Sequence, residues 1–257
     1  MTLEDQIASP GGKRRYVRAL FATIADRYDF ITVALSYGLD RRWKRQLIRL
    51  AAIRAGNRVL DLATGTGDIA FAAAARGAHV VGLDITPRMI ELALAKSVQR
   101  GQDRRDGKDG SALSHPAVPA YPALFLVGDM VALPFAASSF DIVTTGYGLR
   151  NVPDLAGAID EIRRVLSRGG QLLSLDFNRP SNAVLRAAYL AYLTVVGASL
   201  GWVLHRDPDT YRYIPASIRR YPGAEGVARL LQARGFDRVA VYPVLGGLMT
   251  IHHAIRS

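Results

Sequence analysis

Short apolar runs alternate with amphipathic segments along most of the chain. Apolar runs of this length predict buried strands, whereas apolar residues that recur at three- and four-residue spacing predict helices. The predicted strands are 58–63, 79–84, 124–127, 141–145, 171–177, 238–242 and 249–256. The predicted helices among them are 68–76, 87–100, 155–166 and 226–233. This alternation is typical of an α/β fold with a doubly wound, mostly parallel sheet, here of seven strands.

Small residues mark the ends of several predicted helices. Gly77 follows the helix 68–76, and the Gly169-Gly170 pair follows the helix 155–166. Glycine adopts the left-handed conformation that ends many helices more easily than other residues do. Thr86 precedes Pro87, which suits an N-cap followed by the first helical residue.

Helical segments outside this alternation are expected before and within the sheet. Residues 14–52 contain no strand-like run, and their apolar residues at helical spacing include Val17, Leu20, Phe21 and Ile24. We expect one domain over residues 1–257. Its parts are an N-terminal helical cap over 14–52, a core made of 53–178 and 223–257, and a helical insert over 179–222.

Two stretches stand out from the rest of the chain. Residues 101–122 are charged and rich in Gly and Pro, which predicts a long solvated loop. Residues 183–204 carry one charge, Arg186, and are nearly long enough to span a bilayer, with glycines at GxxxG spacing. The strands before and after this stretch should share one sheet, and a single crossing would separate them. We therefore expect a buried or membrane-apposed helix rather than a span.

The overall composition is that of an ordinary globular protein. Of 257 residues, 49% are hydrophobic and 21% charged, which excludes wholesale disorder. The absence of cysteine excludes a disulfide scaffold, cysteine-ligated metals and thiol catalysis. It also fits a reducing compartment. The polar N-terminus has no apolar leader-like run, so we expect a cytoplasmic protein.

The net charge of +11 is concentrated at the two ends of the chain. Residues 1–60 hold 12 basic and 5 acidic side chains, residues 61–180 hold 12 and 13, and residues 181–257 hold 9 and 4. Such an excess suits an anionic membrane surface or simply solvated faces. No helix-turn-helix or basic motif interleaved with aromatics is visible, so we do not expect nucleic acid as a partner.

Acidic residues and glycines at the ends of three predicted strands point to a nucleoside site. Asp61 precedes the turn of Gly65 and Gly67, where backbone could approach a ligand closely. Asp84 ends the next strand, where a carboxylate can accept both ribose hydroxyls. Asp129 follows the third strand, within reach of an adenine amine. A ligand with a cation, a ribose and an adenine but no phosphates is S-adenosylmethionine. A dinucleotide site, or carboxylates that only cap turns, are the alternatives.

Four blocks of the sequence resemble one enzyme family. They read FATIADRYDFITVALSYGLDRRWKRQ, VLDLATGTGDIA, GDMVALPFAASSFDIVTTGYGLRNVPD and YRYIPASIRRYP. Over about residues 16–256 the chain resembles the class I S-adenosylmethionine-dependent methyltransferases, and more narrowly the ubiquinone/menaquinone biosynthesis C-methyltransferases. The resemblance implies a Rossmann-like fold and methylation of a ring carbon on a polyprenylated quinol.

The resemblance also assigns cofactor contacts residue by residue. Gly65, Thr66 and Gly67 would hold the methionine end, and Asp84 the ribose. The adenine would lie against Asp129 and Met130. Two positions depart from the family pattern: Thr32 stands where Asn is usual, and Gly146, in the cofactor site, stands where many members have Ser.

Candidate catalytic residues follow the fourth predicted strand and lie in the cap. Arg150 is a permanent cation suited to a ring oxyanion, with Asn151 beside it, although Arg150 could instead pair with Asp154. Tyr28 and Asp29 of the cap could close over the donor or act on a ring hydroxyl.

Further residues are candidates for contact with the substrate or for removal of protons. Tyr147 could stack on the ring or belong to the core. His252 or His253 could serve as a base near the substrate or lie unused on the surface. Neighbouring residues on a strand point to opposite faces, so this pair does not predict a metal site.

The expected substrate is demethylmenaquinol, with a benzoquinol of ubiquinone biosynthesis as the alternative. Residues 176–180 and 242–249 resemble the naphthoquinone-methylating members of the family more than the ubiquinone ones, and this resemblance favours the naphthoquinol. The insert, with Tyr189, Tyr192 and Trp202, would accommodate the isoprenoid tail. Arginines near the insert would bring the protein peripherally to anionic lipid, and they are Arg179, Arg186, Arg206, Arg212, Arg219 and Arg220. An NAD(P)-dependent oxidoreductase and a non-catalytic scaffold are alternatives from other classes, and a homo-oligomer is left open.

Overall fold

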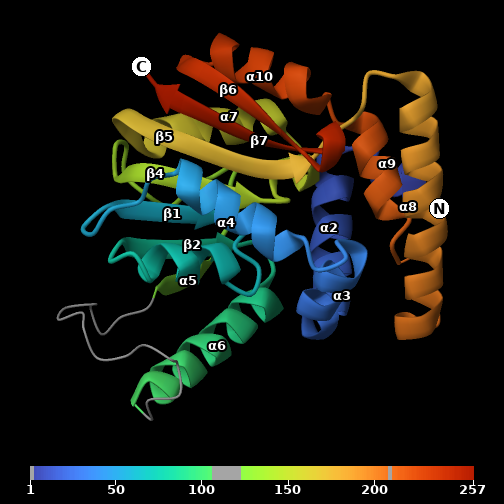
Figure 1. Ribbon diagram of the computed structural model, residues 1–257, viewed down its shortest axis with the longest axis horizontal. Coiled ribbons are helices and arrows are strands. Elements are labelled where there is room, and N and C mark those ends of the chain that lie inside the picture. The colour runs from blue at the N-terminus through green and yellow to red at the C-terminus, as the bar shows by residue number, and fades with distance from the viewer. Residues whose placement is uncertain (1–2, 106–122, 208–209) are drawn as a thin grey trace.

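The computed structural model describes residues 3–105, 123–207 and 210–257 (Figure 1). One seven-stranded sheet has the order β3-β2-β1-β4-β5-β7-β6, and β7 runs antiparallel to both of its neighbours. The strands are β1 (Arg58–Leu62), β2 (His79–Asp84), β3 (Leu124–Val127), β4 (Phe140–Gly146), β5 (Leu166–Phe177), β6 (Phe236–Val244) and β7 (Met249–Arg256). The expected mostly parallel, doubly wound sheet of a Rossmann-like fold is therefore confirmed.

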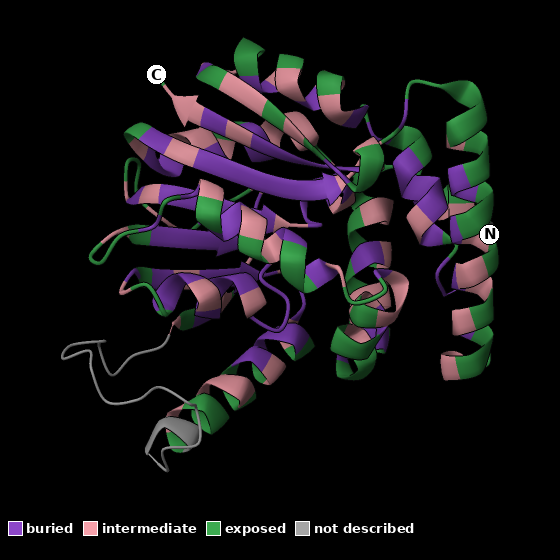
Figure 2. Cartoon of the chain, viewed as in Figure 1, coloured by how far each residue is buried: buried purple, intermediate pink, exposed green. Residues whose placement is uncertain are grey.

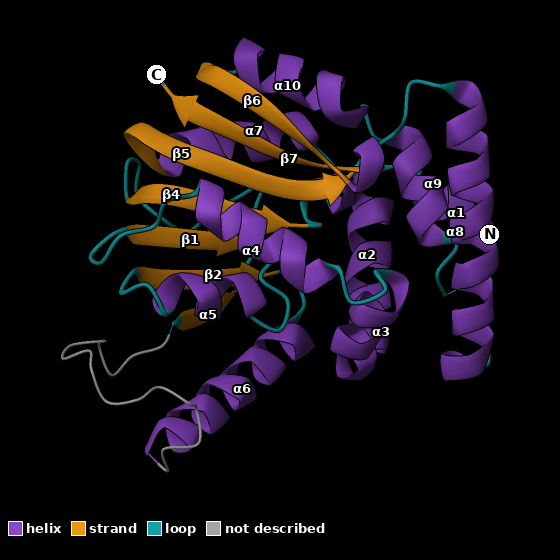
Figure 3. Cartoon of the chain, viewed as in Figure 1, coloured by secondary structure: helices purple, strands orange, loops and turns teal. Residues whose placement is uncertain are grey.

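Helices cover both faces of the sheet (Figure 3). The helices of the core are α4 (Asp40–Leu50), α5 (Asp68–Ala74), α6 (Pro87–Arg105), α7 (Leu155–Val165) and α10 (Gly223–Ala233). Helices α4, α5 and α6 bury their apolar residues against one face, and α7 and α10 against the other. The central strands are buried on both faces, as parallel strands between two helical layers must be (Figure 2).

The remaining helices gather beyond the carboxyl ends of the parallel strands (Figure 1). They are α1 (Leu3–Gln6), α2 (Pro10–Ile24), α3 (Tyr28–Leu35), α8 (Ala183–His205) and α9 (Tyr213–Arg220). Single 3₁₀ turns are η1 (Ala25–Arg27), η2 (Leu149–Asn151) and η3 (Leu245–Gly247). The cap helices α2 and α3 lie between the sheet and α8 (Figure 1). The insert therefore faces the cap on the side away from the sheet.

Some boundaries differ from the sequence prediction. Helix α7 ends at Val165, because Leu166 is extended and fully buried in its pairing with Phe140. Gly169, at a φ of 72°, and Gly170 therefore lie inside β5 and do not end the helix. Helix α6 continues to Arg105, five residues into the predicted loop, and residues 106–122 of that loop lie outside the described part.

The insert contains the long apolar helix α8. By length and composition it could cross a membrane, and 28% of its most apolar stretch is buried within the protein. Tyr189, Leu190 and Leu193 pack against Ile218 of α9, while a Cβ at Gly197 would lie 3.1 Å from Tyr211. The strands on either side of α8 do share one sheet, as the topological argument required. Figure 2 shows exposed residues along the outer side of this helix.

Candidate functional site

Two adjoining cavities lie where the parallel strands end, the edge at which open α/β sheets bind ligands. The first is lined by the turn after β1, the ends of β2 and β3, and cap helix α2. Its lining residues are Arg14, Val17, Phe21, Tyr28, Ala63, Gly65, Leu83, Asp84, Ile85, Thr86, Met89, Gly128, Asp129, Met130, Gly146, Tyr147, Gly148, Asn151, Val152 and Pro153. Most of the predicted cofactor residues are therefore brought together.

Asp84 is fixed at the wall of the first cavity by backbone donors. Its carboxylate accepts hydrogen bonds from the N–H groups of Gly65, at 3.0 Å, and Thr86, at 2.8 Å. Burial raises the pKa of Asp84, and these two backbone hydrogen bonds oppose that rise. Gly65 has a φ of 55°, and a Cβ there would lie 3.6 Å from the Tyr28 ring. The turn thus brings bare backbone and a carboxylate to the same wall.

Asp129 and Met130 form the far side of the first cavity. Arg14 of α2 forms an ion pair with Asp129 at 2.8 Å, so the cap helix is tied to the core across the cavity. Gly146 also lines the cavity, and a Cβ there would lie 2.9 Å from Ile69. A serine at Gly146 would therefore need Ile69 to shift.

The first cavity offers more acceptors than the protein itself satisfies. Thr86 Oγ1 and Asn151 Oδ1 are buried and have no hydrogen-bond partner within the described chain. Two carboxylates, Asp84 and Asp129, lie beside them, and Arg14 is the one cation among the described lining residues. Such a lining suits a ligand rich in N–H and O–H donors and poor in phosphate. The residues present therefore fit S-adenosylmethionine better than a dinucleotide.

Asp61 and the turn residues Thr66 and Gly67 do not line either cavity. Asp61 is 1% exposed and accepts hydroxyl hydrogen bonds from Thr64 and Thr144, each at 2.7 Å. Gly67 is needed for close packing, because a Cβ there would lie 2.8 Å from the Phe71 ring. The structure gives these residues a role in shaping the turn, and their direct contact with a cofactor stays a prediction.

Burial of Asp61 has a measurable consequence for stability. It raises the pKa of the carboxyl to about 6, so the folded protein holds this proton more tightly than the unfolded chain does. The contribution of Asp61 to the free energy of unfolding should therefore fall as pH rises from about 4 to about 6. Across that window we expect the free energy of unfolding of the ligand-free wild type to fall by about 2 kcal/mol more than that of Asp61→Asn. Urea unfolding at several pH values measures this, and two parallel curves would contradict it.

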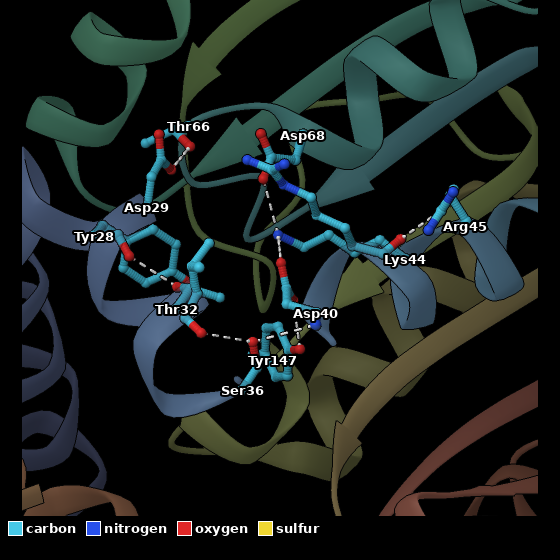
Figure 4. A network of polar contacts seen from close by, with 12 residues as sticks. Tyr28, Asp29, Thr32, Ser36, Asp40, Lys44, Arg45, Thr66, Asp68 and Tyr147 are labelled. Atoms are coloured by element: carbon cyan, nitrogen blue, oxygen red, sulfur yellow. Dashed lines mark hydrogen bonds and ion pairs between the residues drawn. The ribbon is translucent and has the colours of Figure 1, made fainter. Parts of the chain in front are cut away.

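A polar network joins the cap to the turn (Figure 4). Asp29 accepts a hydrogen bond from Thr66 at 2.6 Å and forms an ion pair with Lys96 at 2.6 Å. Lys44 links Asp68 to Asp40 on the other side, and Asp40 accepts from the Tyr147 hydroxyl at 2.6 Å. Asp29 is thus directed at the turn rather than into a cavity, and it holds the cap in place.

The second cavity, of about 300 Å³, lies between the cap and the insert. Its lining is mostly apolar and aromatic, with contributions from α2, α3, α8 and α9. Phe21, Tyr28 and Tyr147 line both cavities and form the wall between them. Tyr147 has a φ of 62°, and its ring also contacts Phe177, with centroids 5.7 Å apart. The predicted Tyr28 and Tyr147 therefore both reach the boundary between the cavities.

Arg150 brings a buried cation to the second cavity. It is 5% exposed, and both its backbone N–H and its guanidinium bond to the carboxylate of Asp176, at 3.0 and 3.3 Å. A further hydrogen bond goes to the Ser217 hydroxyl. The suggested pairing with Asp154 is wrong, because Asp154 instead caps α7 through the Gly157 N–H. Asn151 follows Arg150 and donates to the Tyr147 carbonyl at 2.8 Å.

His252 is not at either cavity. It is fully buried on β7, with Nε2 2.9 Å from the carbonyl oxygen of Ala224 in α10. The expectation that His252 contacts the substrate is therefore corrected. The cavity is instead reached by the first residue of β7, Met249, three positions earlier along the strand.

Some residues of the site were missed from the sequence. Asp176 is the last residue but one of β5, and Asp84 is the last residue of β2, so the position of Asp176 near a strand end was an available signal. Lys13 donates to the carbonyls of Arg150 and Val152, at 3.0 and 2.6 Å, and burial together with the Arg150 charge lowers its pKa to about 8. No local pattern marks Lys13, because its partners lie far away in the chain.

Comparison with known proteins assigns the chain to a family. The model of the ubiE/COQ5 methyltransferase family matches residues 10–256. This chain belongs to the ubiE/COQ5 methyltransferase family. It is 34% identical to the ubiquinone/menaquinone biosynthesis C-methyltransferase UbiE of Azotobacter vinelandii, over 95% of this chain and 91% of that one. It is 37% identical to a demethylmenaquinone methyltransferase of Thermus thermophilus, over 85% and 91%.

Solved structures agree on the fold. An S-adenosylmethionine-dependent methyltransferase of Thermotoga maritima superposes with a TM-score of 0.62 at 16% identity, covering 94% of this chain and all of that one. This ubiE/COQ5 family member is therefore an S-adenosylmethionine-dependent methyltransferase.

Proposed function

We propose that this enzyme methylates a ring carbon of a polyprenylated quinol, with demethylmenaquinol as the substrate. The observation that carries the proposal is the wall of Phe21, Tyr28 and Tyr147, which a polar nucleoside cavity and an apolar aromatic cavity share. Relatives named for quinone biosynthesis, at 34% and 37% identity, support the substrate class. A benzoquinol of ubiquinone biosynthesis is the second candidate, because one of these relatives is named for both quinones.

S-adenosylmethionine, when bound, supplies a methyl group activated by its sulfonium. Asp84 and Asp129 would hold the nucleoside, and the unpartnered Asn151 and Thr86 oxygens would accept from its donors. The aromatic wall then aligns donor and ring, and alignment alone can lower the barrier by roughly 7–11 kcal/mol. On this account the main contribution of the protein to catalysis is to orient the methyl donor and the ring.

Arg150 stabilises the electron-rich form of the quinol. An ionised ring hydroxyl drives electron density onto the neighbouring carbon, which attacks the methyl group. The guanidinium is held by Asp176 and Ser217 before the substrate arrives, so little reorganisation is needed. Burial raises the pKa of Tyr28 to about 12, which keeps its hydroxyl protonated and able to donate to a ring oxygen. The apolar lining excludes water from the developing charge.

The outer face of α8 supports peripheral membrane association from the cytoplasmic side. Val195 and Trp202 are 66% and 67% exposed, and a helix this apolar outside the protein core usually has a partner. Arg179, Arg186 and Arg219 surround a hollow beside the same helix, where anionic head groups would be attracted. Arg220, by contrast, pairs with Glu4 within the protein.

We expect the protein to pellet with anionic liposomes and to be released as salt is raised. Trp202→Glu should weaken binding by at least about fivefold, since one added charge near such a surface contributes about 1 kcal/mol. Val98→Glu, at an exposed apolar position on α6, is the matched control. Liposome binding that changes neither with salt concentration nor on Trp202→Glu substitution would count against the proposal, and so would the absence of binding.

Product analysis with a naphthoquinol and a benzoquinol side by side tests the substrate. We expect the demethylmenaquinol with a short isoprenoid tail to be methylated with the higher kcat/KM. Methylation of the benzoquinol alone would contradict demethylmenaquinol as the substrate and would favour a role in ubiquinone biosynthesis. Absence of methyl transfer to either quinol would favour a non-catalytic scaffold with a methyltransferase fold.

A further inference from the structure

A row of buried polar side chains crosses three strands of the sheet and lies outside the lining of both cavities. Thr145 of β4 pairs with Ser174 of β5, and Ser174 pairs with His252 of β7. Residues paired across neighbouring strands point to the same face of a sheet. All three side chains are 0% exposed. The row therefore lies on one face of three adjacent strands, inside an otherwise apolar core.

These groups lack the hydrogen bonds that buried polar atoms normally make. The hydroxyl oxygens of Thr145 and Ser174, and Nδ1 of His252, have no partner within the described chain, and neither has the hydroxyl of buried Tyr221. A carbonyl oxygen can only accept, so the contact of His252 with Ala224 places the ring hydrogen on Nε2. Nδ1 is then a bare acceptor. Sites of this kind in proteins usually hold ordered water with several polar partners.

The row adjoins the ion pair of Arg150 and Asp176. Asp176 lies two residues beyond Ser174 on β5, so it projects from the same face. Burial lowers the pKa of His252, and the Asp176 charge acts in the opposite direction. Burial raises the pKa of Tyr221, and the Asp176 charge adds to that rise. The described groups linked to His252 are its strand partner Ser174 and the Asp176 charge from β5, and the Ala224 carbonyl from α10.

The second cavity itself offers no base at neutral pH among its described lining residues. The titratable groups there are Arg150 and the phenols of Tyr28, Tyr37, Tyr147, Tyr189, Tyr192, Tyr211 and Tyr213. Phenols are protonated at neutral pH, and guanidinium groups stay charged. Methylation of a ring carbon nevertheless releases a proton, and a group behind this lining can accept it. Asp176 is placed for that, because its chain neighbour Phe177 and its partner Arg150 both line the cavity.

We propose that the row of Thr145, Ser174 and His252 binds ordered water, and that this water passes the released proton from Asp176 to Nδ1 of His252. The proton-transfer part rests on the proposed function. The new carbon–methyl bond forms first, and then the ring C–H bond breaks. Its electron pair restores the aromatic ring, and the proton moves to the Asp176 carboxylate and through the water to His252. When the product leaves, the imidazolium returns the proton through the same water and Asp176 to solvent that enters the second cavity, so His252 takes part in the transfer without touching the substrate.

The activity test compares His252→Gln with His253→Gln. His253 is the matched control, since it points to the opposite face of β7 and bonds to Gln171. With a short-tail demethylmenaquinol, His252→Gln should lower kcat by about 100-fold and leave KM for both substrates nearly unchanged. Wild-type kcat should fall on the acid side of a pKa that lies below that of a free imidazole, because burial lowers the pKa of His252, and this fall should disappear in the variant. Ser174→Ala should lower kcat by a smaller factor, and His253→Gln should behave as wild type.

Retention of wild-type kcat and of its acid limb in a folded His252→Gln protein would overturn the proton transfer. A second readout needs no substrate. The ¹⁵N shifts of His252 should show the Nε2–H tautomer, and a high-resolution crystal structure should show water within hydrogen-bond distance of Nδ1. Absence of ordered water at Thr145, Ser174 and His252, or a His252 ring with its hydrogen on Nδ1, would overturn the proposal. If wild type methylates no quinol, the proposed function fails, and these two measurements still decide whether the row binds water.

Discussion

Replacing Arg150 with alanine is expected to cost both activity and stability. Loss of the cation beside the ring oxygen should lower kcat by about 100- to 1,000-fold, as removal of a pre-organised donor does in other enzymes. The Asp176 carboxylate, which is fully buried, would lose its charged partner. Breaking a buried ion pair in this way destabilises a protein by about 3–5 kcal/mol. Steady-state kinetics and urea unfolding measure the two effects separately.

A double substitution separates the two consequences. Arg150→Met combined with Asp176→Asn removes both charges, so most of the lost stability should return while kcat stays at least as low as in Arg150→Ala. Arg150→Lys keeps the charge but loses the forked contact with Asp176 and Ser217, so it should fall between wild type and the alanine variant. Wild-type turnover in the double variant would show that Arg150 has no catalytic role.

Asp84→Asn should weaken binding of S-adenosylmethionine by about 100-fold, because hydrogen bonds to a charged acceptor contribute about 1.5–3 kcal/mol. The carboxylate is already oriented by two backbone N–H groups and faces the first cavity. Isothermal titration of ligand-free protein gives the affinity directly, and the melting temperature reports whether the turn after β1 survives.

Asp141→Asn is the matched control for Asp84→Asn. Asp141 pairs with Arg58 at the opposite end of the sheet, so its substitution should leave the affinity for S-adenosylmethionine unchanged. Equal affinities of the Asp84 and Asp141 variants would show that Asp84 does not hold the nucleoside.

The succession of strands and helices along the chain and the location of the site could be predicted from local patterns. Alternating strands and helices indicate where the parallel strands end. Asp84 is the last residue of such a strand, and Asp129 and Arg150 each follow one. Tyr28 was found only through the family resemblance, because the cap has no strand pattern to place it.

Side-chain direction could not be predicted in the same way. His252 and His253 are neighbours on β7, and only the pairing with β5 decides which of them faces Asp176. The partner of Arg150 lies 26 residues away on another strand, so no local spacing favours Asp176 over Asp154. Helix α7 ended earlier than its glycines suggested, because burial of Leu166 against β4 outweighed the local signal.

The wall between the two cavities has a consequence for how the enzyme acquires its ligands. Phe21 and Tyr28 come from the cap, whereas Tyr147 comes from the end of a core strand, so the partition is assembled from two separate parts of the chain. Neither compartment is complete until those parts meet. Occupancy of one compartment should therefore shape the other, and we expect the affinities of the two reactants to be thermodynamically linked through this shared surface, past which the methyl group has to be transferred.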